Sequence, residues 1–203
     1  HEHVTLENGE VVCFMRQQTD NGGLRLSLSD YIAPEGIEDY LGVFAVTAGT
    51  GIEDKARSFE RANDDYRAIL DKALCDCLTE ALAEWVDLEF RRLSGITESL
   101  NFVDLIAEKY QGIRPAPGYA ACPDHSLKAQ IWKLLGGEEK IGARLTESFA
   151  MEPGSSVSGF IFAHPEANYF SVGPIGEDQW SELARLRNQP PEQLERWVAF
   201  QQG

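Results

Sequence analysis

The sequence from Thr50 to Gly95 reads TGIEDKARSFERANDDYRAILDKALCDCLTEALAEWVDLEFRRLSG, with apolar residues at the spacing of an α-helix. Thr50 and Glu53 stand three apart and predict a capping box at its start. Arg91 and Arg92, followed by Gly95, predict its end. We expect one helix of roughly forty residues, about 60 Å long, as the spine of the fold. Its apolar positions are Phe59, Tyr66, Ile69, Leu70, Ala73, Leu74, Cys77, Leu78, Ala81, Leu82, Trp85 and Val86.

Short strand patterns flank this helix. Residues 3–33 are predicted to resemble a hairpin of two strands. They contain an apolar run at 11–14, turn residues at 20–23 and alternating leucines at 24–28. Because no internal repeat or low-complexity linker divides 1–203, we expect a single domain of the α+β class. Further strands are predicted at 40–47, 144–151, 157–163 and 169–172. Further helices are predicted at 101–110, 124–135, 178–187 and 191–200, and Asp124 is the predicted cap of the second. Residues 112–123 are predicted to be irregular.

The composition is typical of a globular domain. Of the 203 residues, 43% are hydrophobic and 25% charged, and 18 Lys and Arg against 33 Asp and Glu give a net charge of -15. This charge disfavours nucleic acids and anionic membranes as partners and favours a cationic small ligand. With no apolar run of about 20 residues and no charged-then-apolar leader, we expect no membrane span and a cytoplasmic location. The opening His-Glu-His, without an initiator Met, is typical of a processed or excised piece.

The irregular segment Arg114-Pro115-Ala116-Pro117-Gly118-Tyr119 is the most informative candidate for a binding site. Its two prolines fix φ at alternate positions, and Gly118 permits a close approach that a side chain would block. Arg114 supplies a forked donor for a carboxylate, and Tyr119 supplies a flat apolar face with a polar tip. From the residues alone, a stiff connection whose Arg114 pairs with a local acid is favoured over a ligand site.

Three carboxylates follow one another on the predicted long helix. Asp76, Glu80 and Glu84 stand four apart and therefore share a face. For any one of them a solvated position is favoured. Glu80 borders the apolar positions through Cys77 and Ala81, and a partly buried carboxylate needs a partner, which an ammonium or sulfonium ligand could be.

Other chemical patterns are weaker. Cys75 and Cys77 lie about 200° apart around a helix and cannot bind one metal ion together. Cys122 and His125 offer two ligands where a zinc site needs three or four, so they predict a structural or contact role and no metal site. Residues 48–51, Ala-Gly-Thr-Gly, lack the full phosphate-loop or dinucleotide pattern.

Longer stretches resemble a known family. They are 110–119 (YQGIRPAPGY), 121–125 (ACPDH), 145–151 (LTESFAM), 153–159 (PGSSVSG) and the pair His164-Pro165, with further matches at 42–47, 64–66 and 195–197. In this order they resemble the S-adenosylmethionine-binding activation domain of cobalamin-dependent methionine synthase. The resemblance covers nearly the whole chain from about Arg16 onward.

The resemblance implies a C-shaped α+β domain with a bent antiparallel sheet, a long central helix and flanking helices. It implies S-adenosylmethionine binding in a shallow groove. Arg114 would pair with the ligand carboxylate and Glu80 with its ammonium group. Ala116 and Gly118 would offer backbone contacts to the adenosine, and Tyr169 would line the groove.

The resemblance also implies a methyltransferase role, the reductive remethylation of cob(II)alamin with an electron from flavodoxin or a flavin reductase. Tyr119 would face both ligand and corrin, with Asp76 and His125 toward the corrin side. No Asp-x-His-x-x-Gly signature is present, so a partner module, in the same chain or another, would hold the cobalamin. No catalytic side chain is expected, because cob(I)alamin and a sulfonium need only alignment.

Departures from the family leave a second hypothesis open. The family domain begins with a further N-terminal segment whose acidic residue reaches the ligand, and this chain shows no counterpart of it. A non-catalytic module that senses S-adenosylmethionine or docks on another corrinoid protein is therefore the alternative. For docking of an acidic flavodoxin, Arg91, Arg92 and Lys140 are the candidate basic patch.

Overall fold

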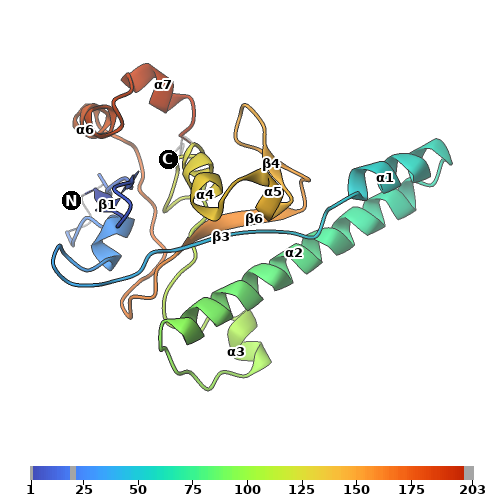
Figure 1. Cartoon of the computed structure of the whole chain (residues 1–203), viewed down its shortest axis with the longest axis horizontal. Helices are drawn as coiled ribbons and strands as arrows, with labels where there is room; N and C mark the ends of the chain where they lie inside the picture. Colours follow the sequence, from blue (N-terminus) through green and yellow to red (C-terminus); the bar gives the residue numbers. More distant parts are fainter. Residues whose placement is uncertain (1, 19–21, 199–203) are drawn as a thin grey trace.

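The computed structural model describes residues 2–18 and 22–198. Its strands are β1 His3–Thr5, β2 Val11–Cys13, β3 Gly42–Thr47, β4 Arg144–Leu145, β5 Met151–Glu152 and β6 Ser156–Ile161. Its helices are η1 Leu28–Tyr31, α1 Ile52–Arg61, α2 Asp65–Leu93, α3 Phe102–Ile106, α4 Leu127–Leu135, α5 Glu138–Ile141, α6 Glu177–Arg187 and α7 Pro191–Glu195. The α+β class is confirmed (Figure 1).

Antiparallel pairing organises the centre of the molecule. β3 and β6 pair from Gly42 with Ile161 to Thr47 with Ser156, which confirms the strands predicted at 40–47 and 157–163. Within the described residues, the pairing forms three two-stranded sheets, β1–β2, β3–β6 and β4–β5. The main core packs between β3–β6, α4 and the N-terminal strands, and its best buried members are Val12, Phe14, Leu28, Ile131, Phe160 and Phe162.

The prediction of one forty-residue helix was wrong in one respect, because the helix is broken into α1 and α2. Asn63 adopts a left-handed φ of 56°, and the Asp64 side chain accepts a hydrogen bond from the Arg67 amide at 3.2 Å. These two residues end one helix and cap the next. Nor is Thr50 a cap, since α1 starts after Gly51 without a side-chain hydrogen bond.

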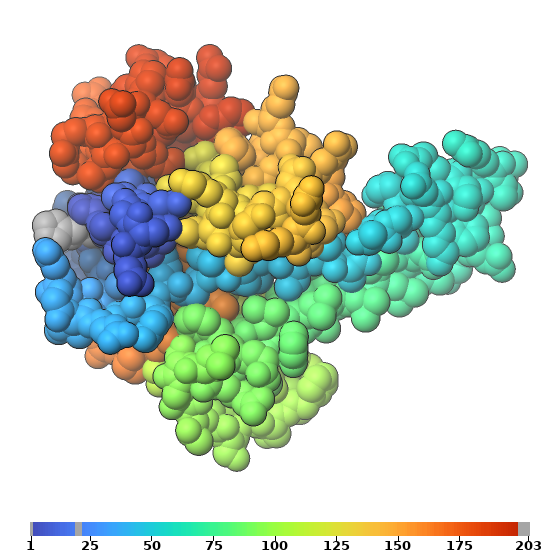
Figure 2. Space-filling model, in the orientation of Figure 1, coloured from blue at the N-terminus to red at the C-terminus, as the bar shows by residue number. Residues whose placement is uncertain are grey.

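α1 folds back along α2 as a helical hairpin. Ion pairs join Lys55 to Asp71 at 2.6 Å and Lys72 to Glu53 at 3.3 Å. Figures 1 and 2 show α1 and the first half of α2 extending from the rest of the molecule as an arm. The second half of α2 lies along β3 and β6 and thereby reaches the centre of the fold.

The face of α2 that packs on the sheet is not the one with the large apolar side chains. Ala83 is fully buried against Phe44 and Ile161, and Phe90 covers Gly42. The large apolar side chains around the rest of the helix are exposed, namely Tyr66, Ile69, Leu70, Leu74, Leu78, Leu82 and Trp85. The apolar spacing therefore predicted the helix correctly, while its large apolar face does not join the core.

Two predicted strands and part of the hairpin were wrong. At 24–28 the predicted strand is reduced to one antiparallel bridge, between Arg16 and Ser27. The chain then enters η1, because Ser27 and Asp30 form the capping box that starts a helical turn. The strand predicted at 144–151 is the hairpin β4–β5, whose loop is closed by the Ala150 amide donating to the Thr146 hydroxyl at 3.0 Å. The segment 169–172 is not assigned to a strand. The first two predicted turn residues, 20 and 21, lie outside the described residues.

The other helices are present with different limits. Residues 101–110 hold only α3, since Glu108 takes a left-handed φ of 50°. α4 starts at Leu127, and Asp124 caps the preceding turn by accepting from the Ser126 amide at 2.8 Å. α6 confirms the helix predicted at 178–187, whereas α7 ends at Glu195; the predicted end at 200 lies outside the described residues.

Arg91 cannot belong to a surface patch. Its side chain is 2% exposed and forms an ion pair with Asp87, which is equally buried. The guanidinium also stacks on the Tyr110 ring at 3.9 Å and lies 3.2 Å from a Glu98 oxygen. The expectation that Arg91 contributes to a docking patch was therefore wrong, because burial removes its charge from the surface.

Candidate functional site

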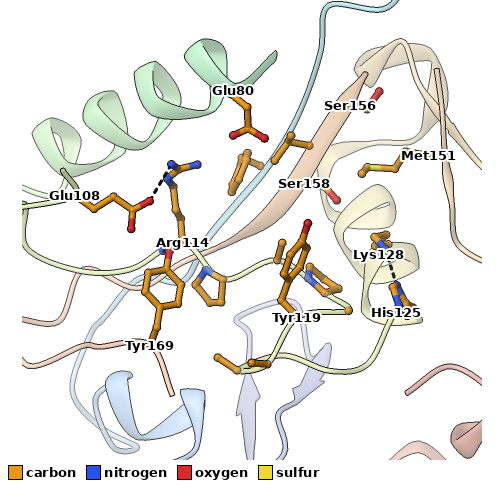
Figure 3. A pocket seen from close by; sticks show the side chains of 18 of the residues that line it. Glu80, Glu108, Arg114, Tyr119, His125, Lys128, Met151, Ser156, Ser158 and Tyr169 are labelled. Atoms are coloured by element: carbon orange, nitrogen blue, oxygen red, sulfur yellow. Dashed lines mark hydrogen bonds and ion pairs between the residues drawn. The ribbon is translucent and has the colours of Figure 1, made fainter. Parts of the chain in front are cut away.

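A cavity of about 640 Å³ opens between α2, the loop that starts at Arg114, and β6 (Figure 3). All six residues that the resemblance implied for ligand binding line it, namely Glu80, Arg114, Ala116, Gly118, Tyr119 and Tyr169. His125 lines it too. Asp76 does not; its carboxylate accepts a hydrogen bond from the Ser155 hydroxyl at 2.6 Å. Sequence segments more than eighty residues apart are thus brought to one surface.

The proline-rich loop is held by the outer edge of β6. The Ile113 amide donates to the Phe162 carbonyl at 3.0 Å, and the Phe160 amide donates to the Pro115 carbonyl at 3.0 Å. An added Cβ on Gly159 would lie 2.8 Å from that same carbonyl, so a glycine is needed for this close approach. The loop is therefore rigid without belonging to a regular strand.

Gly118 turns the loop against His125. Its φ is +102°, and an added Cβ would lie 2.1 Å from the imidazole Cε1. The Gly118 amide donates to the Cys122 carbonyl at 2.7 Å, which closes the turn. Cys122 is itself buried, in agreement with the structural role predicted for it.

We expect Gly118→Ala to lower the free energy of unfolding by about 1–3 kcal/mol, because both the positive φ and the imidazole oppose a methyl group. Urea denaturation measures this. Gly9→Ala is the matched control, since Gly9 has a φ of +81° but no atom within 4 Å of an added Cβ. Equal losses for the two variants would show that the imidazole contact contributes nothing.

Arg114 is held from three sides. Its Nη2 forms an ion pair with Glu84 and lies 3.5 Å from a Glu108 oxygen, and its Nε donates to the Tyr110 hydroxyl at 3.2 Å. Its backbone amide donates to the Tyr169 hydroxyl at 3.1 Å. The pairing with local acids, which the residues alone favoured, is therefore present. Within the described part of the chain, Nη1 has no hydrogen-bond partner.

The carboxylates near Arg114 crowd one another. Burial raises the pKa of Glu84, and the charges of Asp87 and Glu108 act in the same direction, whereas Arg114 opposes them. Glu80 lies one turn earlier on α2 and has no hydrogen bond or ion pair among the described residues. Figure 3 shows Glu80, Glu108 and Arg114 at the α2 side of the cavity. This end is suited to a ligand that carries both a positive and a negative group.

The opposite end of the cavity holds a lysine that the sequence analysis missed. Lys128 is 7% exposed, and its Nζ lies 2.8 Å from the His125 Nδ1. Burial lowers the pKa of both groups, and the Lys128 charge further lowers the pKa of His125. The signal was a lysine three residues after His125, at the start of an apolar helix. Glu108, Met151, Ser156 and Ser158 also line the cavity and were not foreseen.

We expect Lys128→Met to raise the pKa of His125, because it removes a positive charge that disfavours the imidazolium. An NMR titration of the imidazole signals measures the shift. Lys133→Met is the control on the same helix, since Lys133 is exposed and pairs with Glu10 at 2.8 Å. An unchanged pKa in Lys128→Met would show that the two groups do not interact in solution.

Within the described residues, no group of three or more His, Cys, Asp or Glu is placed to hold a metal ion. Over the same residues, no helix combines the length and apolarity needed to cross a membrane.

Comparison with known proteins agrees with this geometry. The family model described as the activation domain of vitamin B12 dependent methionine synthase matches residues 2–188. The crystal structure of the MetH reactivation domain bound to AdoHcy is similar, with 46% sequence identity and a TM-score of 0.90. The similarity covers 94% of this chain and 60% of that chain, so this chain spans less than two thirds of that relative. A family match over most of its length shows that the chain belongs to the activation domains of vitamin B12 dependent methionine synthases.

Proposed function

We propose that this chain binds S-adenosylmethionine in the cavity beside Arg114, as a single domain over residues 1–203. The observation that carries this proposal is that Arg114 and Glu80 line one cavity at the same end. The ligand carboxylate would accept from the Arg114 guanidinium, and the ligand ammonium would lie against Glu80. AdoHcy, which the related reactivation domain binds, is the same molecule without its transferable methyl group.

The remaining predicted contacts follow the loop. Adenosine would lie along Ala116 and Gly118, whose backbone is fixed by β6 and by the turn at Cys122. A fixed backbone lowers the ordering cost of binding. The carboxylates of Glu80, Glu84 and Glu108 would favour the positively charged sulfonium over an uncharged analogue.

The proposed activity is methyl transfer to cobalamin during reactivation of methionine synthase. The nucleophile would be reduced cobalamin, which the cobalamin-binding module would hold and flavodoxin or a flavin reductase would supply with an electron. This chain would bind the methyl donor, orient its sulfonium toward the open side and add no proton-transfer group. Tyr119 is 72% exposed beside the cavity, and we propose that it faces the corrin together with His125 and Asp76.

Isothermal titration of the full chain with S-adenosylmethionine tests the binding proposal. We expect one site per chain and weaker binding of adenosine, which lacks both charged groups. No binding of S-adenosylmethionine would refute the proposal. Binding without methyl transfer, when the cobalamin-binding module and a reductant are added, would instead favour the alternative of a sensing or docking module.

A further inference from the structure

Lys128 is a buried lysine whose ammonium group forms no ion pair with a carboxylate of the described residues. It lies in the first turn of α4, is 7% exposed and lines the cavity. Lysines are almost never buried unless they are paired. Asp124, the acid nearest to it in the sequence, accepts from the Ser126 amide at 2.8 Å and forms an ion pair with Arg187 at 2.6 Å. The side-chain partner of Lys128 is instead the Nδ1 atom of His125, at 2.8 Å.

The direction of this hydrogen bond follows from the chemistry of the two groups. A lysine ammonium has three donors and no acceptor, so Lys128 donates and the Nδ1 atom of His125 accepts. A neutral imidazole whose Nδ1 accepts carries its proton on Nε2. Burial and the charge of Lys128 lower the pKa of His125, while the charge of Asp124 acts in the opposite direction, so the neutral imidazole is favoured.

The imidazole of His125 is also fixed by two other segments. The His125 backbone amide donates to the Trp197 carbonyl at 2.7 Å, which ties this residue to the C-terminal part of the described chain. The ring lies against Gly118, where an added Cβ would be 2.7 Å from Nε2. Figure 3 shows His125 and Lys128 at the end of the cavity away from Arg114. Since Nε2 has no hydrogen-bond partner in the described ranges, its proton is available to a molecule that binds over the cavity.

We propose that Lys128 is a positioning residue, which holds His125 as a neutral donor through Nε2 and excludes the tautomer that would accept there. This inference rests on the proposed function, in which His125 faces the corrin. The group that His125 contacts must then offer a hydrogen-bond acceptor, and the amide side chains of a corrin offer carbonyl oxygens. Lys128 need not contact the corrin, because it acts through the imidazole.

Nitrogen NMR of the isotopically labelled full chain reads the tautomer directly, without any ligand. The His125 signals are identified by their loss in His125→Gln. At a pH above the pKa of His125, we expect an unprotonated Nδ1 and a protonated Nε2 in the unchanged chain. Lys128→Met should let the two tautomers exchange, which moves both nitrogen shifts toward an average. Lys133→Met is the control on the same helix and should leave the shifts unaltered, since Lys133 is exposed and pairs with Glu10.

Two results of this measurement would overturn the proposal. One is a protonated Nδ1 in the unchanged chain, because Lys128 could then not be its donor. The other is a set of His125 shifts in Lys128→Met that equals that of the unchanged chain, because the tautomer would then not depend on Lys128.

A double-mutant cycle tests whether Lys128 acts through His125 in docking. The full chain and its variants are titrated with the cobalamin-loaded cobalamin-binding module of methionine synthase. S-adenosylmethionine is left out, so a failure of the proposed ligand binding does not affect the result. Lys128→Met should weaken docking by roughly fivefold, the effect expected for one hydrogen bond. It should have no further effect in a chain that already carries His125→Leu.

Circular dichroism verifies that each variant in the cycle is folded. If Lys128→Met does not weaken docking, or weakens it equally with and without His125→Leu, Lys128 does not act through the imidazole and the proposal is wrong. If the unchanged chain does not dock at all, the corrin is not the group that His125 contacts, and that part of the proposal is refuted.

Discussion

Arg114→Ala is expected to weaken the binding of S-adenosylmethionine by roughly 10- to 150-fold, the equivalent of about 1.5–3 kcal/mol for hydrogen bonds to a charged group. The Arg114 side chain is 11% exposed, and its guanidinium contacts Glu84, Glu108 and Tyr110. The position of the guanidinium is therefore fixed before a ligand binds. Removing it also leaves Glu84 and Glu108 uncompensated beside the ligand carboxylate, which adds repulsion.

Isothermal titration measures this loss. Arg92→Ala is the control, because Arg92 lies on α2, pairs with Glu89 at 2.8 Å and does not line the cavity. If the two variants bind equally well, Arg114 is no partner of the ligand and its pairing with local acids is its whole role.

Asp87→Ala is expected to lower the free energy of unfolding by about 3–5 kcal/mol, because it removes the buried carboxylate that is the closest ion-pair partner of the Arg91 guanidinium. The remaining contacts of Arg91 are the Tyr110 ring at 3.9 Å and a Glu98 oxygen at 3.2 Å. The Tyr110 hydroxyl in turn accepts a hydrogen bond from the Arg114 Nε. The ion pair of Asp87 and Arg91 therefore supports the position of Arg114 in the ligand site.

Urea denaturation measures the effect, and the paired change Asp87→Leu with Arg91→Met separates its causes. Replacing both charges with apolar groups of similar size removes the uncompensated charge, and we expect most of the lost stability to return. A loss below about 1 kcal/mol for Asp87→Ala would show that Arg91 is stabilised by water or by Glu98 instead.

The sequence predicted the parts of the fold that depend on local pattern. β3 is an apolar run with two valines, β6 begins with alternating serine and apolar positions, and α4 ends at Leu135 as predicted. The break at Asn63 was missed because the helical spacing continues across it, and only the left-handed conformation of one residue separates α1 from α2. The β4–β5 hairpin was missed because its strands are two residues long.

The orientation of α2 could not be read from the sequence. Helical spacing shows which side chains share a face but not which face meets the sheet. Here the face with the smaller side chains, Thr79 and Ala83, packs closely on β3 and β6. The larger side chains of Leu74 and Leu78 are exposed. The choice depends on the shape of the partner surface, which forms only in the folded chain.

The candidate site was predictable where residues are neighbours in sequence and less so where they meet across the fold. The loop from Arg114 to Tyr119 carried its own signal in its prolines and glycine. The pairing of Arg114 with Glu84, 30 residues apart, and the closeness of Lys128 to His125 depend on how α2 and α4 flank the loop. The resemblance to a known family implied which residues would bind the ligand, and the fold brings these residues to one cavity.

The central claim is that Arg114 pairs with the carboxylate of S-adenosylmethionine, and a thermodynamic cycle tests it most directly. The cycle compares the affinities of the full chain and Arg114→Ala for S-adenosylmethionine and for its decarboxylated analogue. If the pairing exists, the substitution weakens S-adenosylmethionine at least tenfold more than the analogue, a coupling of about 1.4 kcal/mol or more. If both ligands lose affinity equally, the carboxylate does not lie on Arg114 and the proposed orientation of the ligand is contradicted.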